Sequence, residues 1–346
     1  MPKAIYKNHK NFGDNQMSEF NLADVGGKRL MKGDSSENIW SFGFIPPHER
    51  TEEEKAFDAE AKSKMIDFQI TGVQEPSDRA FLWECAKVAN GGKHFRTFYQ
   101  QTGSCVGNGG GQALWYLSAV EVVRLKDPEQ VLLPFWLLPY GRSRYYAGSR
   151  GKGEGSFGSA FAEAMRKDGV LEASHEGLPQ CTDQGGLTWG KTAEMNWSDG
   201  GKIDQKWLDL SRKHLLKSTA QVKSALQVRE ALLNYYPCSI ASDWGGQMTP
   251  AVQGSPPVRL NKRADTWNHQ MCVIGTVNHP TLGWIYYILN SWGVDAHGQP
   301  PEGGYGEPPG GFWVSESDMD RIAKQGDSFA FSQFDGFPAQ KLDWTI

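Results

Sequence analysis

Three stretches of the chain carry apolar residues at the spacing of one face of a helix. The first begins at Cys105 and runs to about Lys126, the second lies between Phe157 and Gly169, and the third lies between Val222 and Pro237. Glycine and proline are typical of the point where a helix ends, because neither residue supports helical backbone well. The pattern therefore predicts three helices, and it places a cysteine at or near the N-terminus of the first.

Two continuous apolar runs follow these helices, at Cys272–Val277 and Trp284–Leu289. Their length and their β-branched and aromatic residues are typical of buried strands, and a short loop at 278–283 joins them. Helices that come first and strands that come later favour an α+β protein with two packed lobes.

Residues 1–94 differ from the rest of the chain in being polar and rich in turn residues. Their one clear helix signal is a capping box, in which Thr51 is followed three residues later by Glu54. We expect this segment to be an N-terminal extension with an assembly or regulatory role, and residues 95–346 to form the main domain. An apolar cluster in the extension predicts an anchor that docks on a neighbouring chain: Trp40, Phe42, Phe44 and Ile45.

Composition excludes several classes of function. The 346 residues hold 36 Lys and Arg against 40 Asp and Glu, a net charge of −4, so we expect no nucleic-acid partner. No apolar stretch suits a signal peptide or a membrane span, and we expect no membrane partner. The cysteines lack Cys-x-x-Cys spacing, and His-Glu-x-x-His does not occur, so we expect free thiols, no metal and no cofactor.

Three short segments supply the groups that catalysis by a cysteine nucleophile requires: 100–105, 268–271 and 290–293. A helix N-terminus and a nearby imidazolium both lower a thiol pKa, so we expect a Cys105 thiolate paired with protonated His269. Asn290 would orient the ring of His269. An oxyanion would lie between the backbone N–H of Cys105 and the side chain of Gln100 or Gln101.

These segments resemble the papain-like (C1) cysteine peptidases. Gly103-Ser104-Cys105 keeps three of the four positions of the family's nucleophile motif, with Thr102 in place of its first, disulfide-forming cysteine. Asn268-His269 before an apolar strand and Asn-Ser-Trp-Gly at 290–293 match two further motifs of the family. His269 follows Cys105 by 164 residues and Asn290 follows by another 21, near the separation described for papain and cathepsins. The resemblance covers roughly residues 95–335.

The resemblance implies a papain-like two-lobed fold, with Cys105 in a helical left lobe and His269 and Asn290 in a β-rich right lobe. It implies a cysteine-type endopeptidase that hydrolyses peptide or related amide bonds in peptide or protein substrates through a thioester acyl-enzyme. Trp292 would shield the His-Asn pair from water. A glycine-lined cleft wall, on which the family pairs the substrate backbone, would include these residues: Gly155, Ser156 and Phe157.

The chain departs from the family pattern around the nucleophile. Tyr99 stands six residues before Cys105, where the family has its oxyanion Gln, so the amide would come from Gln100, slightly preferred, or from Gln101. Residues 107–111 put four glycines into the first turns of the helix, which predicts either close backbone packing or a wider cleft. The missing signal peptide and half-cystines resemble the divergent members encoded by bacteria and bacteriophages. We therefore expect an intracellular protein or a virion component.

Two other functions stay open at this point. The chain could be a structural component of a larger assembly, such as a viral particle, that keeps the peptidase fold with little or no activity. Alternatively, the same Cys-His chemistry could cut cell-wall peptides or transfer acyl groups. Gly153-x-Gly155-x-x-Gly158 formally matches a dinucleotide fingerprint, but no apolar strand precedes it. The remaining histidines with no such context are expected at the surface: His94, His175, His214, His279 and His297.

Overall fold

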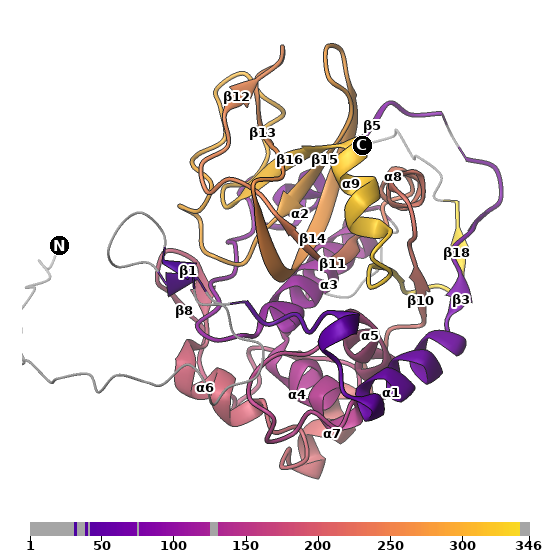
Figure 1. Ribbon diagram of the computed structural model, residues 1–346, viewed down its shortest axis with the longest axis vertical. Helices are drawn as coiled ribbons and strands as arrows, with labels where there is room; N and C mark the ends of the chain where they lie inside the picture. Colours follow the sequence, from indigo (N-terminus) through magenta and orange to yellow (C-terminus); the bar gives the residue numbers. More distant parts are fainter. Residues whose placement is uncertain (1–30, 33–38, 41, 75, 125–130, 340–346) are drawn as a thin grey trace, which may run out of the picture.

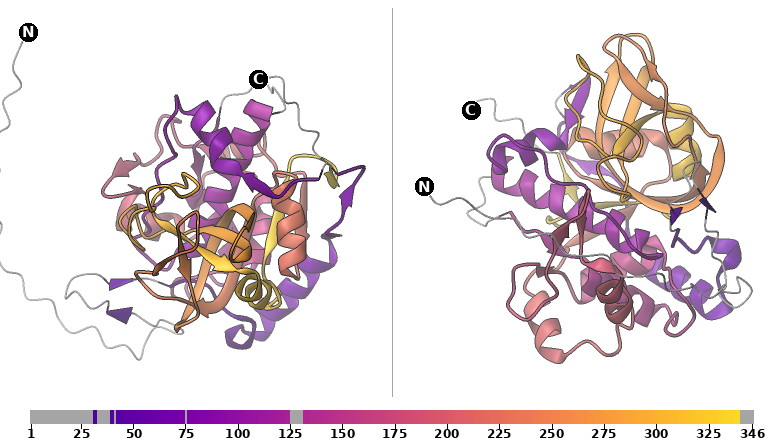
Figure 2. Two further views of the ribbon diagram at one scale, coloured as in Figure 1. Left: turned by 90° about the horizontal axis from the view of Figure 1, so that it is seen from above. Right: turned by 90° about the vertical axis from the view of Figure 1, so that its left-hand side faces the viewer.

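The computed structural model describes residues 31–32, 39–40, 42–74, 76–124 and 131–339. The large sheet lies in the upper half of the molecule in the view of Figure 1, with some helices beside it, and the other helices lie below. The right-hand view of Figure 2 shows the same division from the side. In the described part the helices are α1 (Glu52–Ser63), α2 (Leu82–Ala89), α3 (Cys105–Arg124), α4 (Leu137–Tyr146), α5 (Gly158–Lys167), α6 (Gly190–Trp197), α7 (Gln205–Ser211), α8 (Ala225–Leu233) and α9 (Glu316–Ala323), with a 3₁₀ turn at Pro47–Glu49.

A mixed sheet forms the second half. Its strand order is β12 (Val252–Gln253), β13 (Val258–Asn261), β16 (Gly311–Ser315), β15 (Gly283–Leu289), β14 (Asp265–His279), β11 (Cys238–Gly245), β17 (Phe329–Ser332), β10 (Ser218–Gln221) and β3 (Ile66–Asp67). β5 (Arg79–Phe81) also pairs with β14. Four short antiparallel or parallel pairs lie outside it: β1 (Met31–Lys32) with β2 (Ile39–Trp40), β4 (Ile70–Thr71) with β18 (Phe337–Pro338), β6 (Pro134–Phe135) with β7 (Leu171–Glu172), and β8 (Thr182–Asp183) with β9 (Leu187–Thr188).

The predicted helices and strands are present, and the α+β architecture is confirmed. α3 begins at Cys105, and the chain leaves α5 through Gly169, whose φ of +71° is the left-handed conformation that favours glycine. β14 is much longer than the apolar run that predicted it, because β11 pairs with its first half and β15 with its second. The polar residues His269 and Gln270 are therefore buried inside a strand.

Helix α3 lies where the two halves meet. It packs against β14 of the sheet and against α2, α4 and α5 of the helical half. Its buried residues surround much of its circumference, as expected for a helix enclosed on several sides. A residue at the start of α3 is thereby held next to β14. None of the helices in the described ranges combines the length and apolar character needed to cross a membrane.

The described helices and strands between residues 52 and 89 pack on the rest of the chain. The predicted capping box is present, since Thr51 Oγ1 accepts from the N–H of Glu54 and a carboxylate oxygen of Glu54 accepts from the N–H of Thr51. β5 extends the pairing of β14, and α2 packs on α3. The described part of this segment thus packs on the rest of the chain, and the assignment of 1–94 as an extension with an assembly or regulatory role stays a prediction. The parts of that segment at 1–30, 33–38 and 41 lie outside the described residues.

Candidate active site

Cys105 is the first residue of α3, and the glycines behind it allow neighbouring segments to approach closely. A Cβ on Gly107 would lie 2.4 Å from the Trp136 ring, and one on Gly110 would lie 2.2 Å from the Phe161 ring. Of the two explanations that the sequence left open, close packing accounts for the glycine-rich turns.

The thiol of Cys105 is fully buried. Burial raises the pKa of Cys105 to about 12, and hydrogen bonds from the backbone of Gln270, Gly43 and the start of α3 lower the pKa without offsetting burial. Gln270 directly follows His269 on β14, so Cys105 and His269 belong to adjoining segments. Gly43 comes from the N-terminal part of the chain.

His269 and Asn290 are joined by a hydrogen bond of 2.7 Å between Nε2 and Oδ1. Oδ1 also accepts from the backbone N–H of Ser291 at 2.7 Å, which identifies it as the oxygen of the amide. Nε2 of His269 therefore carries the proton and Nδ1 carries the lone pair. Nδ1 is buried and has no hydrogen-bond partner among the residues described.

Burial also lowers the pKa of His269 to about 4, and the hydrogen bond that its Nε2 donates to Asn290 Oδ1 offsets only part of the effect of burial. With a thiol whose pKa is raised and an imidazole whose pKa is lowered, this conformation favours a neutral pair. Our expectation of a resting thiolate and imidazolium therefore does not hold for this conformation. The reason is desolvation, which penalises both charges and which the sequence does not reveal.

Trp292 lies against His269, and its predicted role of shielding the His-Asn pair stays a prediction. Its ring stacks on His269 with 4.7 Å between centroids and an interplanar angle of 26°. Phe42 meets both rings edge-on, at 5.9 Å from His269 and 5.7 Å from Trp292. His269 and Asn290 are both without exposed surface, so water is excluded from their hydrogen bond.

His297 also contacts this group, contrary to our expectation that it lies at the surface. It is 2% exposed, and its Nε2 lies 2.8 Å from Nδ2 of Asn290. His279 is likewise buried, bonded through Nε2 to the carbonyl of Pro256. Neither histidine lies in a recognisable motif, and only the fold reveals their partners.

The loop before Cys105 is braced by a buried carboxylate. Glu194 of α6 accepts hydrogen bonds from Thr102 Oγ1 at 2.6 Å, from Ser104 Oγ at 2.8 Å and from the backbone N–H of Gln101 at 3.0 Å. Thr102 stands where the resemblance places a disulfide cysteine, so a hydrogen-bonded carboxylate holds this loop instead. Burial raises the pKa of Glu194 to about 7. No motif in the sequence surrounds Glu194, so nothing local in the chain indicates this role.

The two glutamines considered as oxyanion donors differ in burial and in their hydrogen-bond partners. The side chain of Gln100 is buried, donates through Nε2 to the carbonyl of Thr102 at 3.0 Å and accepts from Ser291 Oγ at 2.6 Å. Gln101 is half-buried, and its backbone N–H binds Glu194. The assignment of the oxyanion donor stays a prediction.

A segment of the N-terminal region crosses the site along the predicted cleft wall. Ser156 donates from its N–H to the carbonyl of Gly43 at 2.9 Å and accepts from the N–H of Ile45 at 2.8 Å. Phe44 donates from its N–H to the carbonyl of Asn268 at 3.2 Å. The chain at 42–45 thus binds through its backbone between the wall and the strand of His269.

The position of this segment bears on the anchor predicted from the sequence. Phe42 and Phe44 are buried, 7% and 4% exposed, against their own chain. They therefore do not offer the exposed apolar surface that we expected a neighbouring chain to cover, and the side chain of Trp40 lies outside the described residues. The physical reason is that the rings of His269 and Trp292 pack against Phe42, and the backbone of Ser156 and Asn268 forms hydrogen bonds with this segment.

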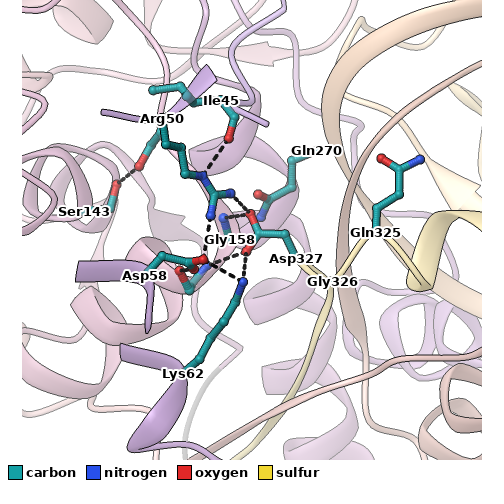
Figure 3. A network of polar contacts seen from close by, with 12 residues as sticks. Ile45, Arg50, Asp58, Lys62, Ser143, Gly158, Gln270, Gln325, Gly326 and Asp327 are labelled. Carbon is teal, nitrogen blue, oxygen red and sulfur yellow. Dashed lines mark hydrogen bonds and ion pairs between the residues drawn. The ribbon is translucent and has the colours of Figure 1, made fainter. Parts of the chain in front are cut away.

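A buried ionic network fixes the chain just after it crosses the site (Figure 3). Arg50 donates to the carbonyl of Ile45 at 3.0 Å and forms ion pairs at 2.8 Å with Asp327 and Asp58. Asp327 also accepts from the N–H groups of Gly158 and Ser159 at the start of α5, and Lys62 pairs with Asp58 at 2.9 Å. Both Arg50 and Asp327 have fully buried side chains, so each charge depends on the other.

Comparison with solved structures identifies the architecture. No protein-family model and no curated protein sequence matches the chain. The structure is similar to xylellain, a cysteine protease from Xylella fastidiosa, with a TM-score of 0.51 and 14% identity over 85% of this chain and 96% of that one. It is also similar to digestive procathepsin L 3 of the Tenebrio molitor larval midgut, with a TM-score of 0.51 and 13% identity over 81% of this chain and 79% of that one. The chain has the α+β fold of the papain-like cysteine proteases.

Proposed function

We propose that the protein is a cysteine peptidase that uses Cys105 as its nucleophile, His269 as its base and Asn290 to orient the base. The observation that carries the proposal is the hydrogen bond from His269 Nε2 to Asn290 Oδ1, which leaves Nδ1 as the basic nitrogen of a strand that adjoins the N-terminus of α3. The substrate is a peptide or protein. We expect the protein itself to be related to the divergent papain-like proteins of bacteria and bacteriophages.

The reaction follows from these positions. Nδ1 of His269 takes the proton of the Cys105 thiol while Sγ forms a bond to the scissile carbonyl carbon. The oxyanion is held by the backbone N–H of Cys105 and by the amide of Gln100 or Gln101. His269 then gives the proton to the leaving amine, and a thioester remains. Water attacks the thioester with its proton passing to His269, which releases a carboxylic acid and restores the thiol.

The segment at 42–45 makes the described conformation a latent one. Its backbone uses the hydrogen-bonding groups of Ser156 and Asn268 that an extended substrate would need, and the backbone of Gly43 contacts the thiol. A substrate must displace this segment before Cys105 can attack. We therefore infer a regulatory role for this part of the N-terminal region.

The same observation favours a second candidate function. A fold whose cleft is filled by its own chain and whose catalytic pair is neutral could serve as a structural component of an assembly, such as a viral particle, with little or no activity. In that case the N-terminal region would also bind neighbouring proteins. The two functions differ in what happens when the cleft is opened.

The test opens the cleft and then looks for cleavage. In Gly43→Ala, the added Cβ would meet the carbonyl of Gly103, so the segment cannot keep its place. The full-length variant is incubated with a mixture of peptides of varied sequence, and the products are identified by mass spectrometry. The peptidase proposal expects new cleavage that disappears in Gly43→Ala/Cys105→Ala.

Labelling by iodoacetamide separates the two candidates. If Cys105 becomes reactive in Gly43→Ala and no peptide is cut, the structural role is favoured and the peptidase proposal is contradicted. Cleavage that persists without Cys105 would contradict the assigned nucleophile.

A further inference from the structure

A buried histidine lies directly behind the proposed His-Asn pair. Nδ2 of Asn290 lies 2.8 Å from Nε2 of His297, and Nδ1 of His297 lies 3.0 Å from the carbonyl oxygen of Met248. These residues come from different segments of the chain: Met248 lies in the turn after β11, and His297 lies in the loop after Asn290. The contacts form one continuous chain from a backbone carbonyl to the proposed base.

Each link in this chain fixes the proton of the next. A carbonyl oxygen only accepts, so Nδ1 of His297 carries the proton and Nε2 is left with a lone pair. That lone pair accepts from the amide nitrogen of Asn290, and this turns the amide oxygen toward His269. The oxygen in turn requires the proton of His269 on Nε2, which leaves Nδ1 bare as the base.

The surroundings of His297 keep its ring in one place and uncharged. Aromatic rings enclose it, with centroids at 4.7 Å for Phe312, 5.7 Å for Trp292 and 6.0 Å for Trp267. Burial, with a smaller effect of the neighbouring His269, lowers the pKa of His297 to about 3, although the hydrogen bond to the Met248 carbonyl acts in the opposite direction. His297 is therefore neutral near pH 7, and its Nε2 can accept a hydrogen bond there.

The backbone of His297 adopts an uncommon conformation. Its φ of +65° lies in the left-handed region, which non-glycine residues rarely occupy and which costs of order 1 kcal/mol or more. Such positions are typical of functional sites, where surrounding contacts maintain the strain. At this position the ring of His297 contacts Asn290 and the carbonyl of Met248.

We propose that His297 is a positioning residue that holds the Asn290 amide and thereby sets the tautomer of His269, making the triad a chain of four side chains. The proposal rests on the proposed function and adds a residue that touches neither substrate nor nucleophile. Its action passes entirely through Asn290. Removing it should therefore affect His269 without altering substrate binding.

The first experiment reads the tautomers directly and needs no activity. The full-length protein is labelled with ¹⁵N-histidine, and ¹H–¹⁵N correlation spectra distinguish protonated from bare ring nitrogens. We expect opposite tautomers, with the proton of His269 on Nε2 and that of His297 on Nδ1. A proton on Nε2 of His297 would overturn the proposal.

Two variants of equal backbone strain isolate the acceptor. His297→Phe keeps a ring and removes the acceptor, whereas His297→Gln can present an oxygen near the position of Nε2. We expect the single tautomer of His269 to give way to a mixture in His297→Phe and to be restored, at least in part, in His297→Gln. His279→Phe, which removes a buried histidine outside this chain of contacts, is the matched control and should leave the His269 signals unchanged. An unchanged His269 in His297→Phe contradicts the proposal.

A double-mutant cycle in the Gly43→Ala background gives the kinetic test. We expect His297→Phe to lower kcat about 10-fold with little change in KM, and to have no further effect once Asn290→Ala is present. Equal losses in both backgrounds would indicate a merely structural role and overturn the proposal. If no form of the protein cuts peptides, the proposed function fails, and the tautomers still decide the role of His297.

Discussion

Gly43 and Gly103 approach so closely that a Cβ built on Gly43 would lie 1.8 Å from the carbonyl oxygen of Gly103. Gly43 belongs to the crossing segment at 42–45, and Gly103 belongs to the loop that precedes Cys105. The backbone of Gly43 also contacts the Cys105 thiol. A residue without a side chain is thus required at the point where the two segments meet.

Gly43→Ala is therefore expected to release the segment and expose Cys105. In the unaltered protein iodoacetamide should modify Cys181 first, because it is half-buried whereas the other four cysteines are buried. In Gly43→Ala we expect alkylation of Cys105 to accelerate at least tenfold, measured by peptide mass spectrometry. Gly151→Ala, where an added Cβ meets nothing within 4 Å, is the control for strain alone. Slow labelling of Cys105 in both variants would show that the segment does not guard the thiol.

The pairing of Arg50 with Asp327 should stabilise both the fold and the crossing segment. Arg50→Met leaves Asp327 as a buried, less compensated charge, and we expect the free energy of unfolding to fall by about 3–5 kcal/mol in urea titrations. Hydrogen exchange at residues 42–50 should also accelerate. Arg150→Met breaks a more exposed pair with Asp199 and should cost much less. Equal losses in the two variants would contradict this assignment.

Glu194 should make stability depend on pH. Its pKa rises from 4.5 to about 7 on folding, so the folded chain holds a proton that the unfolded chain has lost between these pH values. Its contribution to the free energy of unfolding is fully present below pH 4.5 and falls by roughly 3 kcal/mol as pH rises through 7. Glu194→Gln removes this titration, so the difference in stability between variant and parent should change across this window. A constant difference from pH 4.5 to pH 7.5 would show that burial does not raise this pKa.

The glycines of α3 should resist replacement even though alanine favours helices. An added Cβ on Gly110 would meet the Phe161 ring at 2.2 Å, so we expect Gly110→Ala to lower the free energy of unfolding by about 1–3 kcal/mol. The gain of about 1 kcal/mol in helix propensity does not offset this clash. Gly110→Ala/Phe161→Leu makes room for the methyl group and should recover part of the loss. If Gly110→Ala is as stable as the parent protein, the Phe161 ring can move aside for the added methyl group.

The sequence by itself predicted several helices and strands and named the residues proposed for the candidate site. Apolar spacing predicted α3, α5, α8, β14 and β15, because local periodicity follows directly from burial of one face. The ordered motifs at Cys105, His269 and Asn290 predicted which side chains to examine, and the Asn290 contact with His269 is present. These predictions depend on residues that are close together in the chain or that form a known pattern.

Tertiary structure decided what surrounds those residues. Arg50 and Asp327 are 277 residues apart, and Glu194 is 92 residues from Thr102, so no local pattern links them. The burial of Cys105 and His269 depends on Phe42 and its neighbours lying over them, which the sequence predicted as an exposed anchor. Polar side chains such as His297 carry no periodic signal, and their roles follow from the partners that folding brings to them. Desolvation and long-range contacts exist only once the chain is folded, and they set the protonation of this site.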